Sequence, residues 1–309
     1  MSGEAAGPAA LASLLRVYSV EVTAHDTRSI DTVIDHARPE TEVFIANLPN
    51  EKSRMVVEAA RKLSRSGLVP VPHIVARNTA STGELEQLLA ALRTEADVNR
   101  ALILGGDREN SAGNLQSALD IIETGLLQKH GITAVALACY AESHPRIPED
   151  VLWQALHDKL RAAKQAGLQT LLVSQFLFDP QPLIRFARLL REKGVDAPLR
   201  VGIAGPAERT KLIRYALRCG VGASLRVLRS RGDLARNVLA GETPDDLLGT
   251  IAEANAADPS LGITGAHFFT FGDPASSIQW AARHRSDTPE PLSRNAMWDT
   301  PSQDQGGNP

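Results

Sequence analysis

The feature that most constrains the fold is a regular alternation of short apolar runs with segments of helical periodicity. The apolar runs have the length and composition of buried strands, and each is too short for a typical helix. The eight runs are residues 17–23, 42–47, 69–75, 100–106, 133–140, 170–178, 199–205 and 266–272. Because strand and helix alternate along the chain, we expect right-handed βαβ units and a parallel sheet.

The segments between these runs place apolar residues on one helical face, as in residues 51–66. The other helical segments are residues 84–93, 115–128, 151–166, 181–193 and 208–218. Glycines stand where these helices should end, namely Gly67, Gly131, Gly167, Gly194 and Gly220. Eight strand-helix units in about 250 residues favour one α/β domain, a closed (β/α)8 TIM barrel, over an open doubly wound sheet. No Gly-x-Gly-x-x-Gly motif follows the first run, so a Rossmann domain is not indicated.

The same alternation predicts the domain organisation. We expect an N-terminal extension at 1–16, a catalytic barrel at 17–285, and a C-terminal tail at 286–309. Extra helical material at 222–258 precedes the last strand. The tail has the polar, Pro- and Gly-rich composition of a disordered segment, and docking of Trp298 on the barrel or on a neighbouring subunit is the alternative.

Composition excludes several classes of protein. A net charge of -3 gives no general attraction to nucleic acid or to an anionic membrane. No apolar run approaches the roughly 20 residues that span a bilayer, and the first residues lack the basic region of a secretory signal. Two cysteines, Cys139 and Cys219, are too few for a disulfide framework or a Cys-based zinc site. We therefore expect a cytoplasmic protein with reduced thiols, in which Cys139 serves packing.

Polar residues at the carboxyl ends of the strands are the candidates for a site, because the mouth of such a barrel lies there. The clearest stretch is residues 100–107, an apolar strand that ends in Gly105, Gly106 and Asp107. Glycines at this position allow a sharp turn or the close approach of a ligand. The candidates selected in this way are Glu21, His73, Asp107, Tyr140, His144, Gln175, His267 and Thr270.

Each of these residues also has a structural interpretation. Glu21 lies in an apolar strand, where burial would raise its pKa as a general acid requires, or it could pair with an arginine. Asp107 could instead close an Asx turn. His73 could be a core histidine bonded to backbone, and backbone groups could satisfy the amide of Gln175.

Other kinds of chemistry find little support in the sequence. The histidines are scattered without His-x-x-x-His or Cys-pair spacing, so we expect no metal site. The Gly-x-Ser-x-Gly elbow of serine hydrolases and the Walker phosphate loop are both absent. What remains is a mouth with acids, amides, histidines and aromatic rings, which suits a flat polar heterocycle.

Six short motifs along residues 17–282 together resemble the methylenetetrahydrofolate reductase family. They are Ser-Val-Glu-Val at 19–22, Pro-His at 72–73, Leu-Gly-Gly-Asp at 104–107, Ala-Cys-Tyr-Ala-Glu-Ser-His-Pro at 138–145, Ser-Gln-Phe-Leu-Phe-Asp at 174–179 and His-Phe-Phe-Thr-Phe at 267–271. The resemblance implies an oxidoreductase of one-carbon metabolism, built on a (β/α)8 barrel. In that family NADH or NADPH passes hydride to FAD, and the flavoprotein reduces 5,10-methylenetetrahydrofolate to 5-methyltetrahydrofolate.

The resemblance also implies roles for individual residues. Glu21 resembles the general acid that protonates the folate N10, and Asp107 resembles the aspartate that holds the amino-pyrimidine edge of the pterin. Gln175 and Phe269 fall at folate-binding positions. The implied FAD-binding residues are His73, Gly105, Gly106, Ala138, Tyr140, His144 and, near the phosphates, Lys164.

Some residues depart from the pattern of flavin-binding members. Ala46 stands where they have a threonine, Gly105 where they have an arginine, and Phe269 and Asp273 replace a tyrosine and a nearby arginine. A flavin-independent reductase with direct hydride transfer is therefore one alternative. Arg226 could bind the folate glutamate tail or a nucleotide phosphate, or it could be an outward-facing residue after a helix cap.

The direction of the reaction and the choice between NADH and NADPH stay open at this point, as does assembly into homo-oligomers. A different class is a folate-binding barrel that serves a methyltransferase without catalysing a reaction. Retention of Glu21 argues against this class, because binding alone requires no buried acid.

Overall fold

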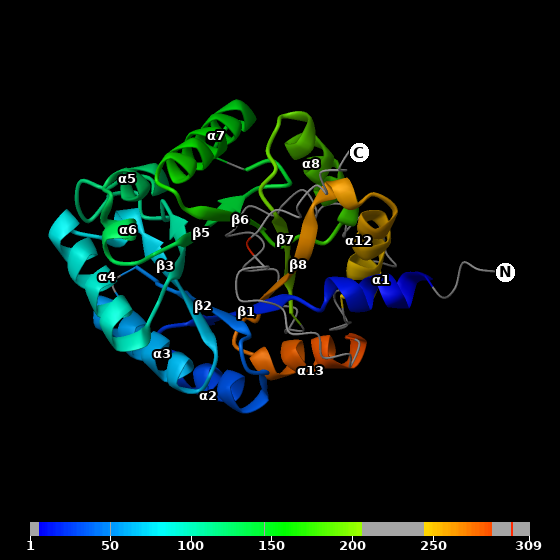
Figure 1. The fold of residues 1–309 in the computed structure, drawn as a ribbon, viewed down its shortest axis with the longest axis horizontal. Coiled ribbons are helices and arrows are strands. Elements are labelled where there is room, and N and C mark those ends of the chain that lie inside the picture. Colours follow the sequence, from blue (N-terminus) through cyan, green and yellow to red (C-terminus); the bar gives the residue numbers. More distant parts are fainter. Residues whose placement is uncertain (1–5, 50, 145, 206–243, 286–297, 299–309) are drawn as a thin grey trace, which may run out of the picture.

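The computed structural model describes residues 6–49, 51–144, 146–205, 244–285 and 298, and within them the strands form a closed parallel barrel (Figure 1). Each strand pairs with the next one along the chain, and β8 closes the ring against β1. The strands are β1 Tyr18–Thr23, β2 Glu42–Ala46, β3 Val69–Val75, β4 Arg100–Leu104, β5 Ala134–Cys139, β6 Gln169–Ser174, β7 Leu199–Ala204 and β8 Ile263–Phe269. The predicted (β/α)8 barrel is confirmed.

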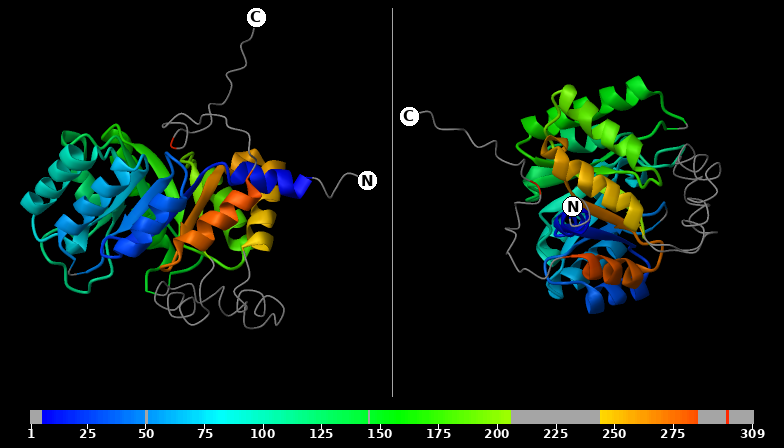
Figure 2. Two further views of the ribbon diagram at one scale, coloured as in Figure 1. Left: turned by 90° about the horizontal axis from the view of Figure 1, so that it is seen from below. Right: turned by 90° about the vertical axis from the view of Figure 1, so that its right-hand side faces the viewer.

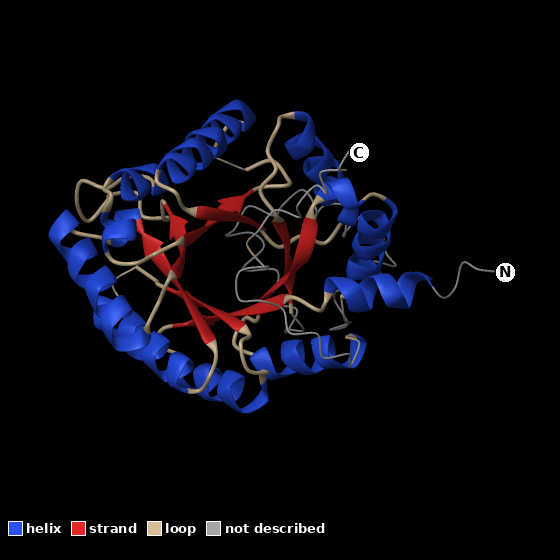
Figure 3. Cartoon of the chain, viewed as in Figure 1, coloured by secondary structure: helices blue, strands red, loops and turns tan. Residues whose placement is uncertain are grey.

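Helices surround the ring of strands on its outer side (Figure 3). They are α1 Ala6–Leu14, α2 Thr27–His36, α3 Ser53–Arg65, α4 Thr82–Ala96, α5 Ala118–Glu123, α6 Leu126–Lys129, α7 Glu149–Gln165, α8 Pro180–Glu192, α12 Asp245–Ala257 and α13 Pro274–His284, with 3-10 turns η1 Ala76–Asn78 and η2 Pro259–Leu261. Helices α1 and α12 pack together beside the barrel, as Figure 2 shows from two further sides. Among the described residues, no helix has the length and apolar character needed to cross a membrane.

Most elements differ from their predicted bounds by a few residues, as in β6, which ends at Ser174 rather than at residue 178, and two of the differences have a clear cause. The helix expected at 115–128 is split into α5 and α6 by Gly125, whose φ of 70° lies in the left-handed region. Strand β8 begins at Ile263 rather than Ala266, because Gly265 is part of the strand and not of a turn. A Cβ at Gly265 would lie 2.3 Å from the carbonyl oxygen of Val17, so only glycine allows this close approach.

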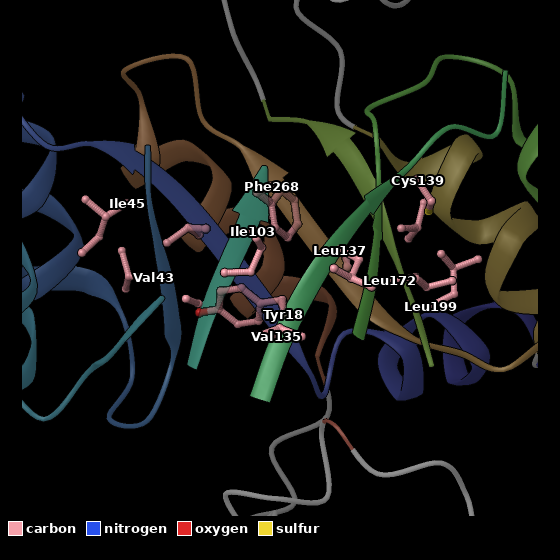
Figure 4. Packing of buried hydrophobic residues seen from close by; sticks show 14 of the residues in the cluster. Tyr18, Val43, Ile45, Ile103, Val135, Leu137, Cys139, Leu172, Leu199 and Phe268 are labelled. Atoms are coloured by element: carbon pink, nitrogen blue, oxygen red, sulfur yellow. The ribbon is translucent and has the colours of Figure 1, made fainter. Parts of the chain in front are cut away.

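The alternation of side chains along each strand produces two apolar layers. Outward residues such as Val43, Ile103, Leu137 and Phe268 pack in the large cluster between strands and helices (Figure 4). A smaller cluster fills the barrel. It is formed, apart from Trp298, by the residues of the same strands whose side chains point inward. Its members are Phe44, Val71, Leu102, Ala134, Ala136, Leu171, Val173 and Trp298.

Trp298 is thus part of the barrel interior. Its side chain is 2% exposed, and its indole Nε1 donates a hydrogen bond of 2.7 Å to Glu42 Oε1. The guanidinium of Arg100 lies 5.5 Å from the centre of the indole ring. The composition of the tail predicts disorder, with docking of Trp298 on the barrel as the alternative. At Trp298 the structure shows the alternative, because a buried carboxylate and an apolar wall hold the indole. The other tail residues lie outside the described part.

Candidate active site

The site is centred on Glu21 of β1, whose side chain points into the barrel because its neighbours Val20 and Val22 pack outward. Glu21 Oε2 lies 3.3 Å from His73 Nε2 on β3 and 3.6 Å from His267 Nε2 on β8. Neither contact has hydrogen-bond geometry, and within the described residues both Nε2 atoms are buried without a hydrogen-bond partner. The fold therefore gathers three candidates from distant parts of the sequence into one cluster.

The pKa of Glu21 corrects the sequence interpretation. Burial does raise it, as expected, and burial is the largest single influence. The polar and charge interactions of the carboxylate with His267 and His73 together outweigh burial and lower the pKa of Glu21 to about 2. Glu21 is accordingly a carboxylate in this structure rather than a protonated acid.

His267 is held tightly on its other side. Its Nδ1 lies 2.9 Å from Ser19 Oγ, and its ring meets Phe44 edge-on at 4.5 Å between centroids. Burial lowers the pKa of His267, and although Glu21 raises it, Arg200 and His73 add to the lowering. The imidazole is therefore neutral at physiological pH.

Aromatic rings extend from the histidine toward the mouth. The ring centroid of Phe269 lies 4.8 Å from that of His267 and 5.5 Å from that of Phe176, and both pairs of rings meet edge-on. The ring of Phe176 also packs against those of Phe178 and Phe271, with 5.8 and 5.5 Å between centroids. Phe269 is partly exposed, so it offers a wall to a flat ring that enters the mouth.

Asp107 follows the two glycines of β4 and is exposed at the mouth. Gly106 has a φ of 100°, and a Cβ there would lie 2.6 Å from Val75 Cγ1, so the turn requires glycine. Within the described chain no hydrogen bond to the Asp107 carboxylate is present, which argues against the Asx turn. Its charge raises the pKa of His144, although burial and Arg146 have the larger opposite effect. Asp107 and His144 are thus close enough for their charges to interact.

Gln175 is partly buried just beyond β6, and its amide is already engaged at one end. Its Oε1 accepts a hydrogen bond of 3.1 Å from the backbone N–H of Phe176. This is the backbone contact that the sequence left open as an alternative. The amide nitrogen makes no hydrogen bond within the described residues, so it is the end that a ligand could use.

A cavity of about 340 Å³ opens beside the carboxyl end of β5, between α7 and α8. Ala138 and Tyr140 line it, as the resemblance implies for cofactor contacts, and the ring of His144 lies 5.1 Å from that of Tyr140. Lys159 also lines the cavity, and burial lowers its pKa. The lining thus combines aromatic side chains with the cations Lys159 and Arg185 and the carboxylates Glu142 and Glu149.

The structure corrects the assignment of Lys164. This residue is exposed in the last turn of α7, directly before β6 begins, so it lies at the end of the barrel opposite the mouth. Lys159 occupies the position facing the cavity because it lies nearly one and a half helical turns closer to the mouth. Arg226 lies outside the described residues.

Sequence reasoning missed four residues that support this arrangement. Ser19 bonds His267, Lys159 lines the cavity, and Glu42 and Arg200 form a buried ion pair with 2.6 Å between Oε2 and Nη1. One signal was available, because Glu42 and Arg200 are charged residues at the beginning of otherwise apolar strands. A search of the described residues finds no group of three or more His, Cys, Asp or Glu side chains able to hold a metal ion.

The profile of the family described as methylenetetrahydrofolate reductase matches residues 46–223, which is more than half of the chain. The chain belongs to the methylenetetrahydrofolate reductase family. Family membership makes it an oxidoreductase of folate metabolism, in agreement with the resemblance stated from the motifs.

Among solved structures, the chain is similar to dihydropteroate synthase (FolP) from Thermus thermophilus. The identity is 14%, the match covers 86% of this chain and 93% of that chain, and the TM-score is 0.44.

Proposed function

We propose that this member of the methylenetetrahydrofolate reductase family interconverts 5,10-methylenetetrahydrofolate and 5-methyltetrahydrofolate with NADH or NADPH as the hydride donor. In the reductive direction the methylene carbon gains a hydride and N10 gains a proton. The observation that carries the proposal is the cluster of Glu21 with His73 and His267 inside the barrel mouth. A site that only presents folate has no need for a partly buried acid between two imidazoles.

Glu21 is the residue proposed to handle the N10 proton. It is ionised before folate binds, with a pKa of about 2. Burial is the largest influence on this pKa and raises it. A flat pterin that covers the mouth would add to burial, so folate binding drives Glu21 toward the protonated form that N10 requires.

The surrounding residues are proposed to hold the substrate. Asp107 would accept from the amino-pyrimidine edge, Gln175 would donate through its free amide nitrogen, and Phe269 would stack against the ring. If this chain is run physiologically in the oxidative direction, the same residues act in reverse, as microscopic reversibility requires.

FAD is proposed as the intermediate hydride carrier. The lining of the cavity beside β5 fits such a cofactor in part, because Tyr140 supplies an aromatic wall and Lys159 a cation for a phosphate. When bound, FAD would accept hydride from the nicotinamide and deliver it to the folate. A direct transfer from nicotinamide to folate uses the same folate residues and is the alternative.

The test is to purify the protein, record its visible absorption, and follow NADH and NADPH oxidation with methylenetetrahydrofolate, with and without added FAD. Flavin absorption together with folate-dependent oxidation supports the full proposal. Folate-dependent oxidation by a colourless protein that ignores FAD overturns the flavin part alone. If no condition gives folate-dependent oxidation while folate still binds, the protein belongs to the binding-only class.

The cytoplasmic location stays a prediction from the sequence.

A further inference from the structure

A group of charged residues occupies the end of the barrel opposite the mouth. Glu42 is 1% exposed, and its two oxygens accept hydrogen bonds of 2.6 Å each from Arg100 Nη1 and Arg200 Nη1. Trp298 Nε1 adds a third hydrogen bond to Glu42. These contacts fix the position of the Arg200 guanidinium.

From Arg200 the polar contacts continue toward the mouth. The same Nη1 donates a hydrogen bond of 3.1 Å to Ser19 Oγ, which lies 2.9 Å from His267 Nδ1. His267 Nε2 in turn faces Glu21 Oε2 at 3.6 Å. Ser19, Arg200 and His267 are each at most 1% exposed, so water does not compete for these contacts.

The donor inventory fixes the direction of these bonds. A guanidinium only donates, so Ser19 Oγ is an acceptor toward Arg200. The hydroxyl hydrogen of Ser19 then needs an acceptor, because a buried donor left without one is costly. His267 Nδ1 is the acceptor within reach. A neutral imidazole that accepts at Nδ1 carries its proton on Nε2, which is the nitrogen facing Glu21.

This arrangement also selects which oxygen of Glu21 is available. Both histidines contact Oε2, so Oε1 is the oxygen left for a substrate. The charged and titratable groups that act on His267 are Glu21, Arg200 and His73. The positive charge of Arg200 opposes a second proton on His267, so the ring keeps a single N–H.

The geometry points to Ser19 and Arg200 as positioning residues, which lock His267 in the tautomer with its proton on Nε2 and so direct an N–H toward Oε2 of the Glu21 carboxylate, 3.6 Å away. Glu42 and Trp298 anchor Arg200 from the other end of the barrel. The catalytic consequence rests on the proposed function, in that Glu21 handles the folate proton. The tautomer of His267 does not depend on the proposed function.

The first experiment therefore measures the tautomer without any reaction. Long-range ¹H–¹⁵N spectra of protein labelled at histidine are recorded, and His267 is assigned by the signals lost in His267→Gln. We expect the Nε2–H pattern in the wild-type protein and a shift toward a mixture of tautomers in Ser19→Ala. An Nδ1–H pattern in the wild-type protein, or an unchanged His267 pattern in Ser19→Ala, overturns the proposal even if the enzyme is fully active.

The second experiment tests the catalytic consequence in full-length protein. Ser19→Ala should lower kcat about tenfold, the effect of one lost hydrogen bond, with little change in the KM for folate. Ser19→Thr keeps the hydroxyl and should restore kcat. Trp298→Phe keeps the ring but removes the N–H, and a two- to threefold loss is expected because both arginines still hold Glu42.

Ser29→Ala is the matched control, since Ser29 is also a buried serine but bonds Asp26 at the start of α2. Equal losses in Ser19→Ala and Ser29→Ala, or no recovery in Ser19→Thr, would mean that Ser19 acts only through general stability. A wild-type protein without turnover would refute the proposed function and leave the tautomer result to stand by itself.

Discussion

Glu21 and Glu42 are carboxylates on adjacent strands, inside the same barrel, with a pKa of about 2 each. Their contacts differ. Both oxygens of Glu42 are held at 2.6 Å by arginines at the end of the barrel opposite the mouth. In Glu21 the ion-pair contacts with described residues are at Oε2, with imidazoles at 3.3 and 3.6 Å. The exposed fraction of the side chain is 1% for Glu42 and 21% for Glu21.

A low pKa alone does not distinguish a structural carboxylate from a functional one. Burial raises the pKa in both residues, and different partners reverse the effect: Arg200 and Arg100 for Glu42, His267 and His73 for Glu21. Glu42 cannot exchange a proton without breaking strong hydrogen bonds. Glu21 can, because neither histidine contacts its Oε1 and its side chain is partly exposed at the mouth.

The largest expected effect is at the mouth. Glu21→Gln should lower turnover by roughly 10²- to 10⁴-fold, the range for loss of a general acid, because glutamine cannot deliver a proton. Folate binding should remain measurable by calorimetry, since the side chain keeps its size. Normal turnover in this variant would show that Glu21 is not the acid. Glu21 would then have a structural role, as Glu42 does.

At the end of the barrel opposite the mouth, a substitution of Glu42 should affect stability rather than turnover. Glu42→Gln leaves two buried arginines without their counter-charge and should lower the free energy of unfolding by about 3–5 kcal/mol, as measured by urea denaturation. Glu58→Gln is the control, because Glu58 is 54% exposed in its pair with Arg54, and about 1 kcal/mol or less is expected. Similar losses in both variants would contradict the structural role of Glu42.

The pH dependence of stability tests the same contrast. Folding lowers the pKa of Glu42 from 4.5 to about 2, so its stabilisation is complete above pH 4.5 and is lost as the pH falls toward 2. The loss is on the order of 3 kcal/mol. The difference in unfolding free energy between wild type and Glu42→Gln should therefore narrow over this window. A constant difference down to pH 2 would exclude ionised Glu42 as its source.

Two lysines of α7 lie toward opposite ends of the barrel and should differ in their effect on cofactor binding. Lys159→Met should weaken binding of a phosphate-bearing cofactor, FAD or the nicotinamide, by about tenfold, because a buried cation is removed. Lys164→Met should change nothing, since that side chain is exposed at the far end. Titration of both variants by fluorescence distinguishes them, and a loss confined to Lys164→Met would reverse the assignment.

The smallest effect is expected at the aromatic wall. Phe269→Leu should raise the KM for folate about fivefold, because an aromatic contact contributes roughly 0.5–1.5 kcal/mol beyond the area it buries. The KM for NAD(P)H serves as the internal control and should stay constant. An equal rise in both values would place Phe269 outside the folate site.

Much of the barrel follows from local sequence. The alternation of strand and helix sets the topology, and the glycines at helix ends have the left-handed φ that such ends require, as at Gly67 and Gly167. Strand ends also identify the mouth, so Glu21, His73 and Asp107 could be named as candidates beforehand. The start of β8 at Ile263 could not, because the place of Gly265 in the strand depends on Val17, whose carbonyl oxygen lies 2.3 Å from where a Cβ would be.

The sequence by itself therefore determined the architecture and which polar residues reach the mouth, since both depend on patterns within a strand or helix. Only the tertiary structure decided the state of Glu21, because the sign of its pKa shift depends on His73 and His267, which come from other strands. The same holds for Lys159 in place of Lys164, which depends on which turn of α7 faces the cavity. It holds as well for Trp298, whose partner Glu42 is 256 residues away in the sequence.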